Sequence, residues 1–201
     1  MKHKLWLQLL VIYTRYAIGG AFVFASLIKI KGERFTTESG ANEAINTSWH
    51  FFETMYQSGL YWQFIGFGQL FAGFLLMTQR FAKLGAILNL PILCNIFVIT
   101  LSYYFAFTPV IVGLMLVANI GLFFWDWNEL KILFNLPYKQ KIKTFENDIV
   151  WQIIGLMLFL FTFFYRLFVD KYDAFFWLSI CFIIGIVGLV FGLKKYKKQR
   201  L

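Results

Sequence analysis

The sequence predicts an all-α membrane protein, with an antiparallel bundle of four transmembrane helices, a C-terminal two-helix transmembrane hairpin and a short interfacial helix in the first outer loop. Two observations carry this prediction. The chain of 201 residues is 60% hydrophobic and 14% charged, whereas a soluble domain carries about 25% charged residues. The apolar residues also form long runs, with most of the basic residues between them. A soluble fold of this size has too little interior to bury so much apolar surface, so lipid is the expected solvent.

Six apolar stretches approach the roughly 20 residues that are needed to cross the hydrocarbon of a bilayer. They lie at about residues 5–28, 60–78, 84–105, 109–125, 149–169 and 174–193. The first begins like a secretory signal, with Lys2 and Lys4 before an apolar run, but Arg15 interrupts that run and no small-x-small cleavage site follows. We therefore expect the first stretch to be a retained helix.

The segments between the stretches indicate which helices are neighbours. Pro109 follows a tight turn and suits the first position of a helix, so the third and fourth stretches are expected to form a hairpin. The link around 79–83 is also short, which places the second stretch beside the third. Within the first loop, aromatic residues recur at helical spacing over 48–57, which predicts an amphipathic helix in the membrane interface.

The basic residues divide unequally between the two sides of this six-span arrangement. Of the 19 Lys and Arg residues, 13 fall on the side of the termini and 4 on the opposite side. The positive-inside rule then places both termini in the cytoplasm and the protein in the cell membrane. We expect three regions: a four-helix core over 1–130, a basic cytoplasmic linker over 131–148, and a two-helix hairpin with a Lys-rich tail over 149–201.

Polar side chains within the four-helix core are the first candidate site. Arg15 is predicted near mid-depth, where a charged side chain needs partners. Gln69, Asn95 and Asn119 lie at a similar depth in the next three helices, so the four are expected to face one another. Interhelical hydrogen bonding alone explains such a layer, and a site for a ligand, proton or substrate is the alternative. The positive charge of Arg15 favours an anionic or quinone-like headgroup over a cation.

A second candidate cluster lies at the outer mouth of the core. It contains Lys29, His50 and Glu53, and the last two are three residues apart, so they share a helix face. Histidine with glutamate serves in acid–base chemistry or metal binding, but two ligands do not make a metal site. Solvated interface residues are the simpler interpretation. The sequence contains no HExxH, GxSxG or Walker-type motif, and it predicts no catalytic residue and no metal.

Three segments carry a resemblance to a known family. They are RYAIGGAFVFASLIKIKG from Arg15, GLYWQFIGFGQLFAGFLLMTQRFAKLGAILNLPI from Gly59, and FTPVIVGLMLVANIGLFFWDW from Phe107. Over about residues 8–130 the chain resembles the DoxX-like family of small four-helix membrane proteins.

The resemblance implies a four-helix bundle in a bacterial cytoplasmic membrane, and in some relatives an association with quinone-linked sulfur oxidation or redox complexes. Arg15, Gly19 and Lys29 match the pattern of the family's first helix. Gln69 stands where an acidic or amide residue is expected, and if relatives use a carboxylate there, the amide of Gln69 puts proton-linked chemistry in doubt. The helices after residue 148 go beyond the minimal family unit.

Three functions therefore stay open. The first is a non-catalytic multipass protein, either a partner subunit or a small bundle that binds a lipophile or an anion. The second is a membrane component of a quinone-linked redox system, and the third is a small transporter. The sequence encodes no cofactor motif, although a quinone suits a positive core. The expected partners are the lipid bilayer and another membrane protein or a second copy; nucleic acid is not expected, because the basic residues do not gather on one face or arm.

Overall fold

A computed structural model describes residues 4–137, 145–171 and 173–198. Every regular element in these ranges is helical. Seven α-helices and two short 3-10 helices follow one another along the chain: α1 (Leu5–Ile30), α2 (Ser48–Gln57), α3 (Leu60–Met77), α4 (Ala82–Ser102), α5 (Thr108–Leu130), η1 (Lys131–Phe134), η2 (Phe145–Asn147), α6 (Ile149–Phe168) and α7 (Ala174–Lys198).

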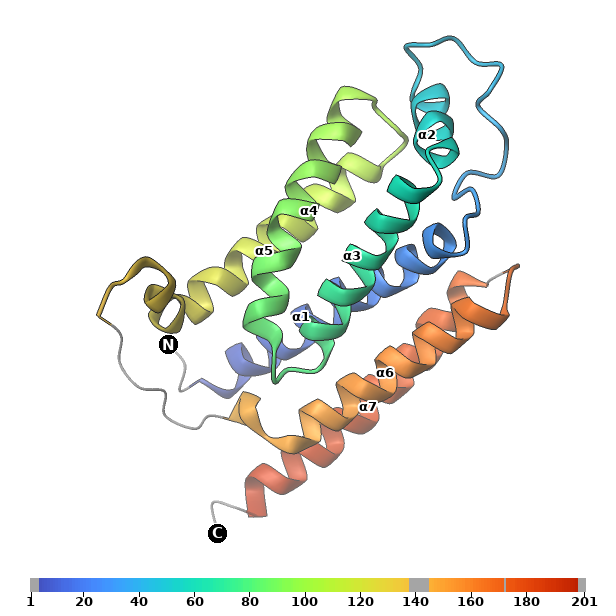
Figure 1. The fold of residues 1–201 in the computed structure, drawn as a ribbon. Coiled ribbons are helices and arrows are strands. Elements are labelled where there is room, and N and C mark those ends of the chain that lie inside the picture. Colours follow the sequence, from blue (N-terminus) through green and yellow to red (C-terminus); the bar gives the residue numbers. More distant parts are fainter. Residues whose placement is uncertain (1–3, 138–144, 172, 199–201) are drawn as a thin grey trace.

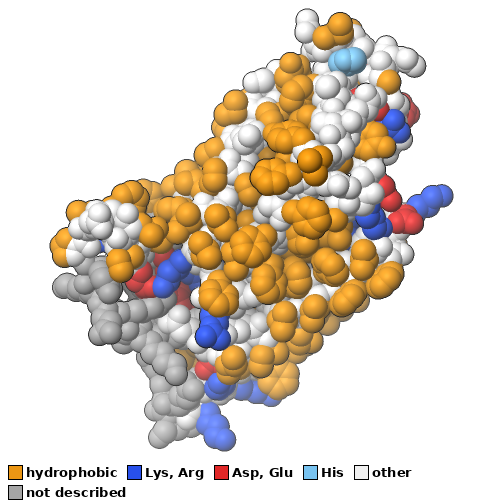
Figure 2. Space-filling model, viewed as in Figure 1, with side chains coloured by type: hydrophobic (Ala, Val, Ile, Leu, Met, Phe, Trp, Pro, Cys, Tyr) orange, Lys and Arg blue, Asp and Glu red, His pale blue; other side chains and the backbone are white. Residues whose placement is uncertain are grey.

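All the α-helices except α2 are long and apolar enough to cross a membrane, so the chain is a multipass membrane protein with six candidate spans. This confirms the predicted all-α class and the predicted number of membrane-spanning stretches. On the face shown in Figure 2, hydrophobic side chains cover the middle of the molecule and charged side chains gather toward its ends. That distribution suits a protein whose middle is surrounded by lipid.

Helix α1 is the centre of the packing, because α3, α5, α6 and η2 all contact it. Its closest neighbour is α3, and the two helices meet through glycines. A Cβ atom on Gly19 would lie 2.8 Å from the carbonyl oxygen of Gly73, and a Cβ on Gly73 would lie 2.7 Å from that of Gly19. Small residues at a helix interface allow this close backbone approach in membranes. Helices α4 and α5 continue the arrangement beyond α3 (Figure 1).

Helices α6 and α7 lie side by side, and α6 packs on the opposite flank of α1 from α4 (Figure 1). Trp151 of α6 is fully buried and accepts a hydrogen bond on its carbonyl oxygen from the hydroxyl of Tyr16. Gly155 contacts the carbonyl oxygen of Met77, so α6 also touches the end of α3. The start of α1 and the end of α7 lie at one end of the molecule, and α2 lies at the other (Figure 1). We call these the termini end and the α2 end.

The short helix α2 occupies residues 48–57, as the sequence predicted. Thr47 caps it by accepting a hydrogen bond from the backbone N–H of His50. Residues before α2 fold back on it: a Cβ atom on Gly40 would collide with the backbone of Trp49, so only glycine fits there. The helix and its loop therefore form a compact cover over the α2 end. Its predicted place in the membrane interface stays a prediction.

Candidate functional site

Arg15 is almost fully buried, at 3% exposure, and it is held by a cluster of polar groups at the termini end. Its guanidinium donates to Asp126 Oδ2 at 2.7 Å and to Gln79 Oε1 at 3.0 Å. Glu146 Oε2 lies 4.0 Å from the same guanidinium. Asp126 comes from the last turn of α5, Gln79 from the α3–α4 turn and Glu146 from η2. The cluster therefore ties four segments of the chain together.

A second ring of hydrogen bonds fixes these partners. The indole N–H of Trp125 donates to Glu146 Oε2 at 2.7 Å, and the backbone N–H of Glu146 donates to Gln8 Oε1 at 3.1 Å. Gln79 has a positive φ of 56°, which is unfavourable for a residue with a side chain. Its amide offsets that cost by also donating to the carbonyl oxygen of Ile12 at 3.2 Å. These hydrogen bonds fix the partners of Arg15 in place, although the buried Nε atom of Arg15 itself has no hydrogen-bond partner.

The structure does not bring Arg15 together with Gln69, Asn95 and Asn119. Arg15 lies at the level of the α3–α4 turn, not at mid-depth, because carboxylates at the helix ends are its partners. Asn119 instead accepts from Asn89 Nδ2 at 3.2 Å and donates to the carbonyl oxygen of Ala86 at 3.0 Å, which joins α4 to α5. A role for these residues in binding a ligand stays a prediction.

Gln69 and Asn95 lie on a cavity of about 570 Å³ in the half of the molecule nearer α2. This volume falls within the range of about 300–1,000 Å³ that is typical of sites for small molecules. Helices α1, α3, α4 and α5 all contribute to its walls, and most lining side chains are aliphatic or aromatic. The cavity is therefore built for an apolar occupant.

Among the residues that the structure describes, Lys29 is the one charged residue that lines this cavity. Its ammonium turns back along α1, donates to the carbonyl oxygen of Ala25 at 2.8 Å and lies 5.1 Å from the ring centre of Trp62. No carboxylate among the described residues pairs with it. Gln69 is 3% exposed, and its Oε1 atom has no hydrogen-bond partner. The cavity thus combines apolar walls with two polar groups that have unused hydrogen-bonding capacity.

An aromatic cap closes the cavity toward α2. Phe35, Phe52 and Phe105 pack edge to face, with ring centres 4.9 to 5.8 Å apart, and Phe35 also reaches Trp62 at 6.0 Å. Phe35 is itself 37% exposed, so the cap is partly open at the α2 end, and the other exposed lining residues lie on α3 and α4. They are Tyr61, Phe64, Pro91 and Asn95. The cavity therefore opens sideways, between α3 and α4, onto the apolar flank of the molecule.

The three residues of the expected outer-mouth cluster take separate roles. Lys29 faces the cavity, whereas Glu53 receives a two-pronged ion pair from Arg34, with both N···O distances at 2.8 Å. Gln57 and the backbone N–H of Gly40 donate to the same carboxylate. The Arg34 hydrogen bonds lower the pKa of Glu53 from 4.5 to about 2. Glu53 therefore fastens the loop to α2, and no contact joins it to His50 or Lys29 among the interactions found in the described residues.

Three members of the Arg15 cluster were not predicted from the sequence. Asp126 lies near the end of a predicted span, and Gln79 and Glu146 lie in a turn and in the basic linker, where solvated side chains are the usual expectation. One signal was present in the sequence: residues 131–145 contain four lysines and no acidic residue, and Glu146 is the first carboxylate after them. A carboxylate within a basic segment beside a membrane end is a candidate partner for a buried arginine.

Comparisons with known proteins give a single short similarity. No family model matches the chain, and no solved structure matches it. The chain is similar to the "Uncharacterized protein YwoB" of Bacillus subtilis (strain 168), with 38% identity over 66 residues. That similarity covers 33% of this chain and 41% of the relative, so the chain matches less than half of the relative's length.

Proposed function

We propose that this protein binds a lipophilic molecule within the membrane, in the cavity between α1, α3, α4 and α5. The observation that carries the proposal is the cavity itself. It has a volume of about 570 Å³ and apolar walls, and it lies inside a protein with six candidate membrane spans. Close packing leaves few voids larger than a water molecule in a folded interior. A space of this size has a cost in lost contacts unless a ligand fills it.

The way into the cavity also supports a lipophilic ligand. The aromatic cap covers the cavity toward the α2 end, and four of the five exposed lining residues face the apolar flank between α3 and α4. A molecule dissolved in the bilayer reaches such an opening by lateral diffusion. At the α2 end a water-soluble molecule meets the packed rings of Phe35, Phe52 and Phe105, of which Phe35 is 37% exposed.

We extend the proposal to the arrangement of the chain in its membrane. Helices α1, α3, α4 and α5 form an antiparallel core that holds the ligand, and α6 and α7 form a hairpin that buttresses α1. The excess of basic residues at the termini end supports a cytoplasmic location for both termini in a cell membrane, with α2 outside. The resemblance of residues 8–130 to the DoxX-like family supports the same four-helix core, and membership of that family is part of the proposal.

Native mass spectrometry of protein released from nanodiscs tests the proposal. The perturbation is Gly68→Leu, which places a leucine side chain in the cavity. Gly68 lines the cavity, and a Cβ atom there would meet only Ile92 Cδ1, at an ordinary contact distance of 3.7 Å, so the backbone need not move. The matched control is Gly121→Leu, at an exposed helix position with nothing within 4 Å of a Cβ. Both changes replace glycine by a better helix-forming residue, so each should stabilise its helix by up to about 1 kcal/mol. We expect one retained lipophile on the wild type and the control, and none on Gly68→Leu; an equal load on all three refutes the proposal.

A further inference from the structure

We propose that the ligand of the cavity is an anionic amphiphile, with a carboxylate or phosphate headgroup on Lys29 and its chain between α3 and α4. This inference rests on the proposed function and adds the chemistry of the headgroup. It starts from Lys29, which is the only charged residue among the cavity's lining residues. An unpaired ammonium in an apolar surrounding is costly, and an anionic ligand removes that cost.

The direction of the Lys29 side chain is the next step. A lysine near the end of a membrane helix ordinarily extends its ammonium toward water. The ammonium of Lys29 instead lies back over α1, on the carbonyl oxygen of Ala25 and beside the ring of Trp62. The carbonyl contact uses one of the three N–H donors of the ammonium, which leaves donors for an oxygen anion. Asp170 is paired with Lys31 and Glu53 with Arg34, and the exposed Glu33 forms no ion pair with Lys29 among the described residues.

Gln69 provides an independent observation that points to a ligand. Its side chain is buried and lines the cavity, yet its Oε1 atom has no partner. A buried polar atom without a hydrogen bond costs roughly 1–3 kcal/mol, so native proteins seldom leave one. Gly66 of α3 packs on the Lys29 Cβ, at 2.9 Å from a Cβ built on that glycine, which puts Gln69 about 4.5 Å deeper along the helix. A headgroup on Lys29 with a hydroxyl or a protonated oxygen one turn deeper satisfies both.

The walls of the cavity fit the remainder of such a molecule. Below the Lys29 level the lining is aliphatic and aromatic, with Phe22, Val112 and Met115 at the back and Phe64 and Ile96 toward the opening. One chain occupies this space, and its end extends into the surrounding lipid through the opening. The aromatic cap keeps water from the ion pair, which strengthens the attraction between the headgroup and Lys29.

Equilibrium binding of two probes that share the same hydrocarbon chain tests the inference. The probes are oleate and oleyl alcohol, which differ at the headgroup, and oleoyl lysophosphatidate serves as the phosphate arm. The variants are Lys29→Met, which keeps the length of the side chain without its charge, and Lys29→Arg, which keeps the charge. Lys31→Met is the matched control, because Lys31 lies two residues away and pairs with Asp170 outside the cavity.

We expect Lys29→Met to weaken oleate and lysophosphatidate about tenfold or more, because a charge-assisted hydrogen bond is lost, and to leave oleyl alcohol unchanged. Lys29→Arg and Lys31→Met should keep oleate binding near the wild-type level. If Lys29→Met leaves the binding of oleate and of oleyl alcohol unchanged, or weakens the two equally, the headgroup assignment is wrong while the cavity still binds lipophiles. If inorganic phosphate competes with every probe, the site recognises a free anion and the amphiphile is wrong. If no probe binds, or Gly68→Leu blocks none, the proposed function fails as well.

Discussion

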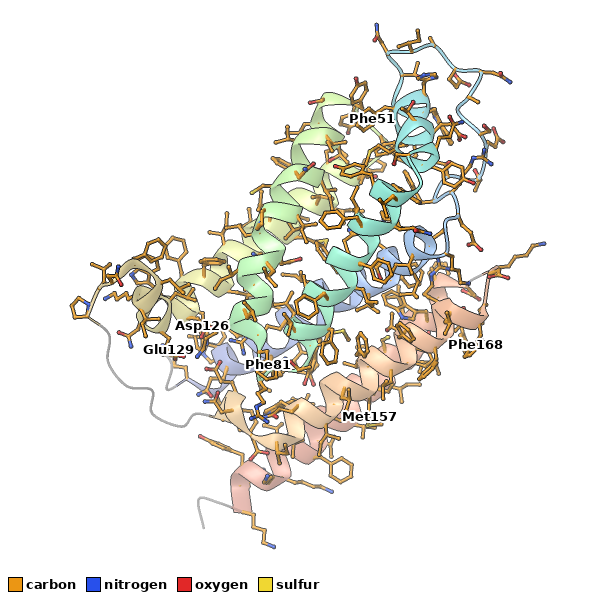
Figure 3. The ribbon with its side chains drawn as sticks, in the orientation of Figure 1. Phe51, Phe81, Asp126, Glu129, Met157 and Phe168 are labelled. Atoms are coloured by element: carbon orange, nitrogen blue, oxygen red, sulfur yellow. The ribbon has the colours of Figure 1, made fainter. Side chains whose placement is uncertain are left out.

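Replacement of Arg15 by methionine should destabilise the protein more than the loss of any other cation at the termini end. The change removes the hydrogen bonds that Arg15 donates to the Asp126 carboxylate and to Gln79 Oε1, in surroundings where the two side chains of the ion pair are 3% and 2% exposed. Removal of one partner from a buried ion pair costs about 3–5 kcal/mol, because the other charge stays buried and unpaired. Figure 3 shows Asp126 at the end of the molecule where the α3–α4 turn carries Phe81, far from Phe51 of α2.

The matched control for this change is Lys83→Met. Lys83 pairs with Glu129 at the same end, but its side chain is 39% exposed, so we expect a loss of at most about 1 kcal/mol. Asp126→Asn keeps an oxygen that accepts from Arg15 and should lose less than Arg15→Met, about 1–3 kcal/mol. Addition of Asp126→Leu to Arg15→Met should recover part of the loss, because it removes the buried carboxylate whose arginine partner is gone.

The assay is SDS-induced unfolding in mixed micelles, followed by tryptophan fluorescence, with the free energy of unfolding compared across the five proteins. Membrane hydrogen bonds between neutral groups contribute only about 0.6 kcal/mol on average, so the expected loss for Arg15→Met lies well above that level. A loss no larger than that of Lys83→Met refutes the view that the Arg15 cluster holds the termini end together.

Two further predictions concern the α2 cover and the contact of α6 with α3. The pKa of Glu53 is lowered from 4.5 to about 2, so the Arg34–Glu53 pair contributes stability above about pH 4.5 and loses it as the pH falls through 2. Pepsin should cut the loop before α2 increasingly over that window, and Glu53→Gln should be cut throughout it; a wild-type profile matching the variant contradicts the assignment. Gly155→Ala should lower the unfolding free energy by about 1–3 kcal/mol, because its methyl group would collide with the backbone at Met77. Gly185→Ala, with 3.4 Å to a Tyr13 ring carbon, is the control, and equal stability of both variants contradicts the packing.

The sequence was sufficient for the elements that depend on local pattern. Runs of apolar residues identify the six long helices because each run must match the thickness of a bilayer. The aromatic periodicity of 48–57 identifies α2, since the spacing of residues on one helix face is a local feature. The shared end of the two termini follows from an even number of spans.

Pairings between distant segments were beyond the sequence alone. Arg15 was assigned a depth by its place in its own helix, but its level is set by where α3 and α5 end relative to α1. Glu146 reaches Arg15 from a linker whose lysines suggested only a solvated segment. Gln69 and Asn95 were correctly recognised as polar residues inside the spans, but only the packing of four helices shows that both line one cavity. Lys29 likewise looked like an interface lysine until its neighbours were in place.

Photo-crosslinking in a bilayer tests the central claim most directly, with an oleate whose chain carries a diazirine and with labelled residues mapped by peptide sequencing. Phe22 and Val112 line the cavity and are only 2% and 7% exposed, so lipid around the protein does not reach them. The account predicts label on these two residues in the wild type and its loss in Gly68→Leu. Label confined to lipid-facing residues such as Phe124 and Phe182, with no change in Gly68→Leu, would contradict it.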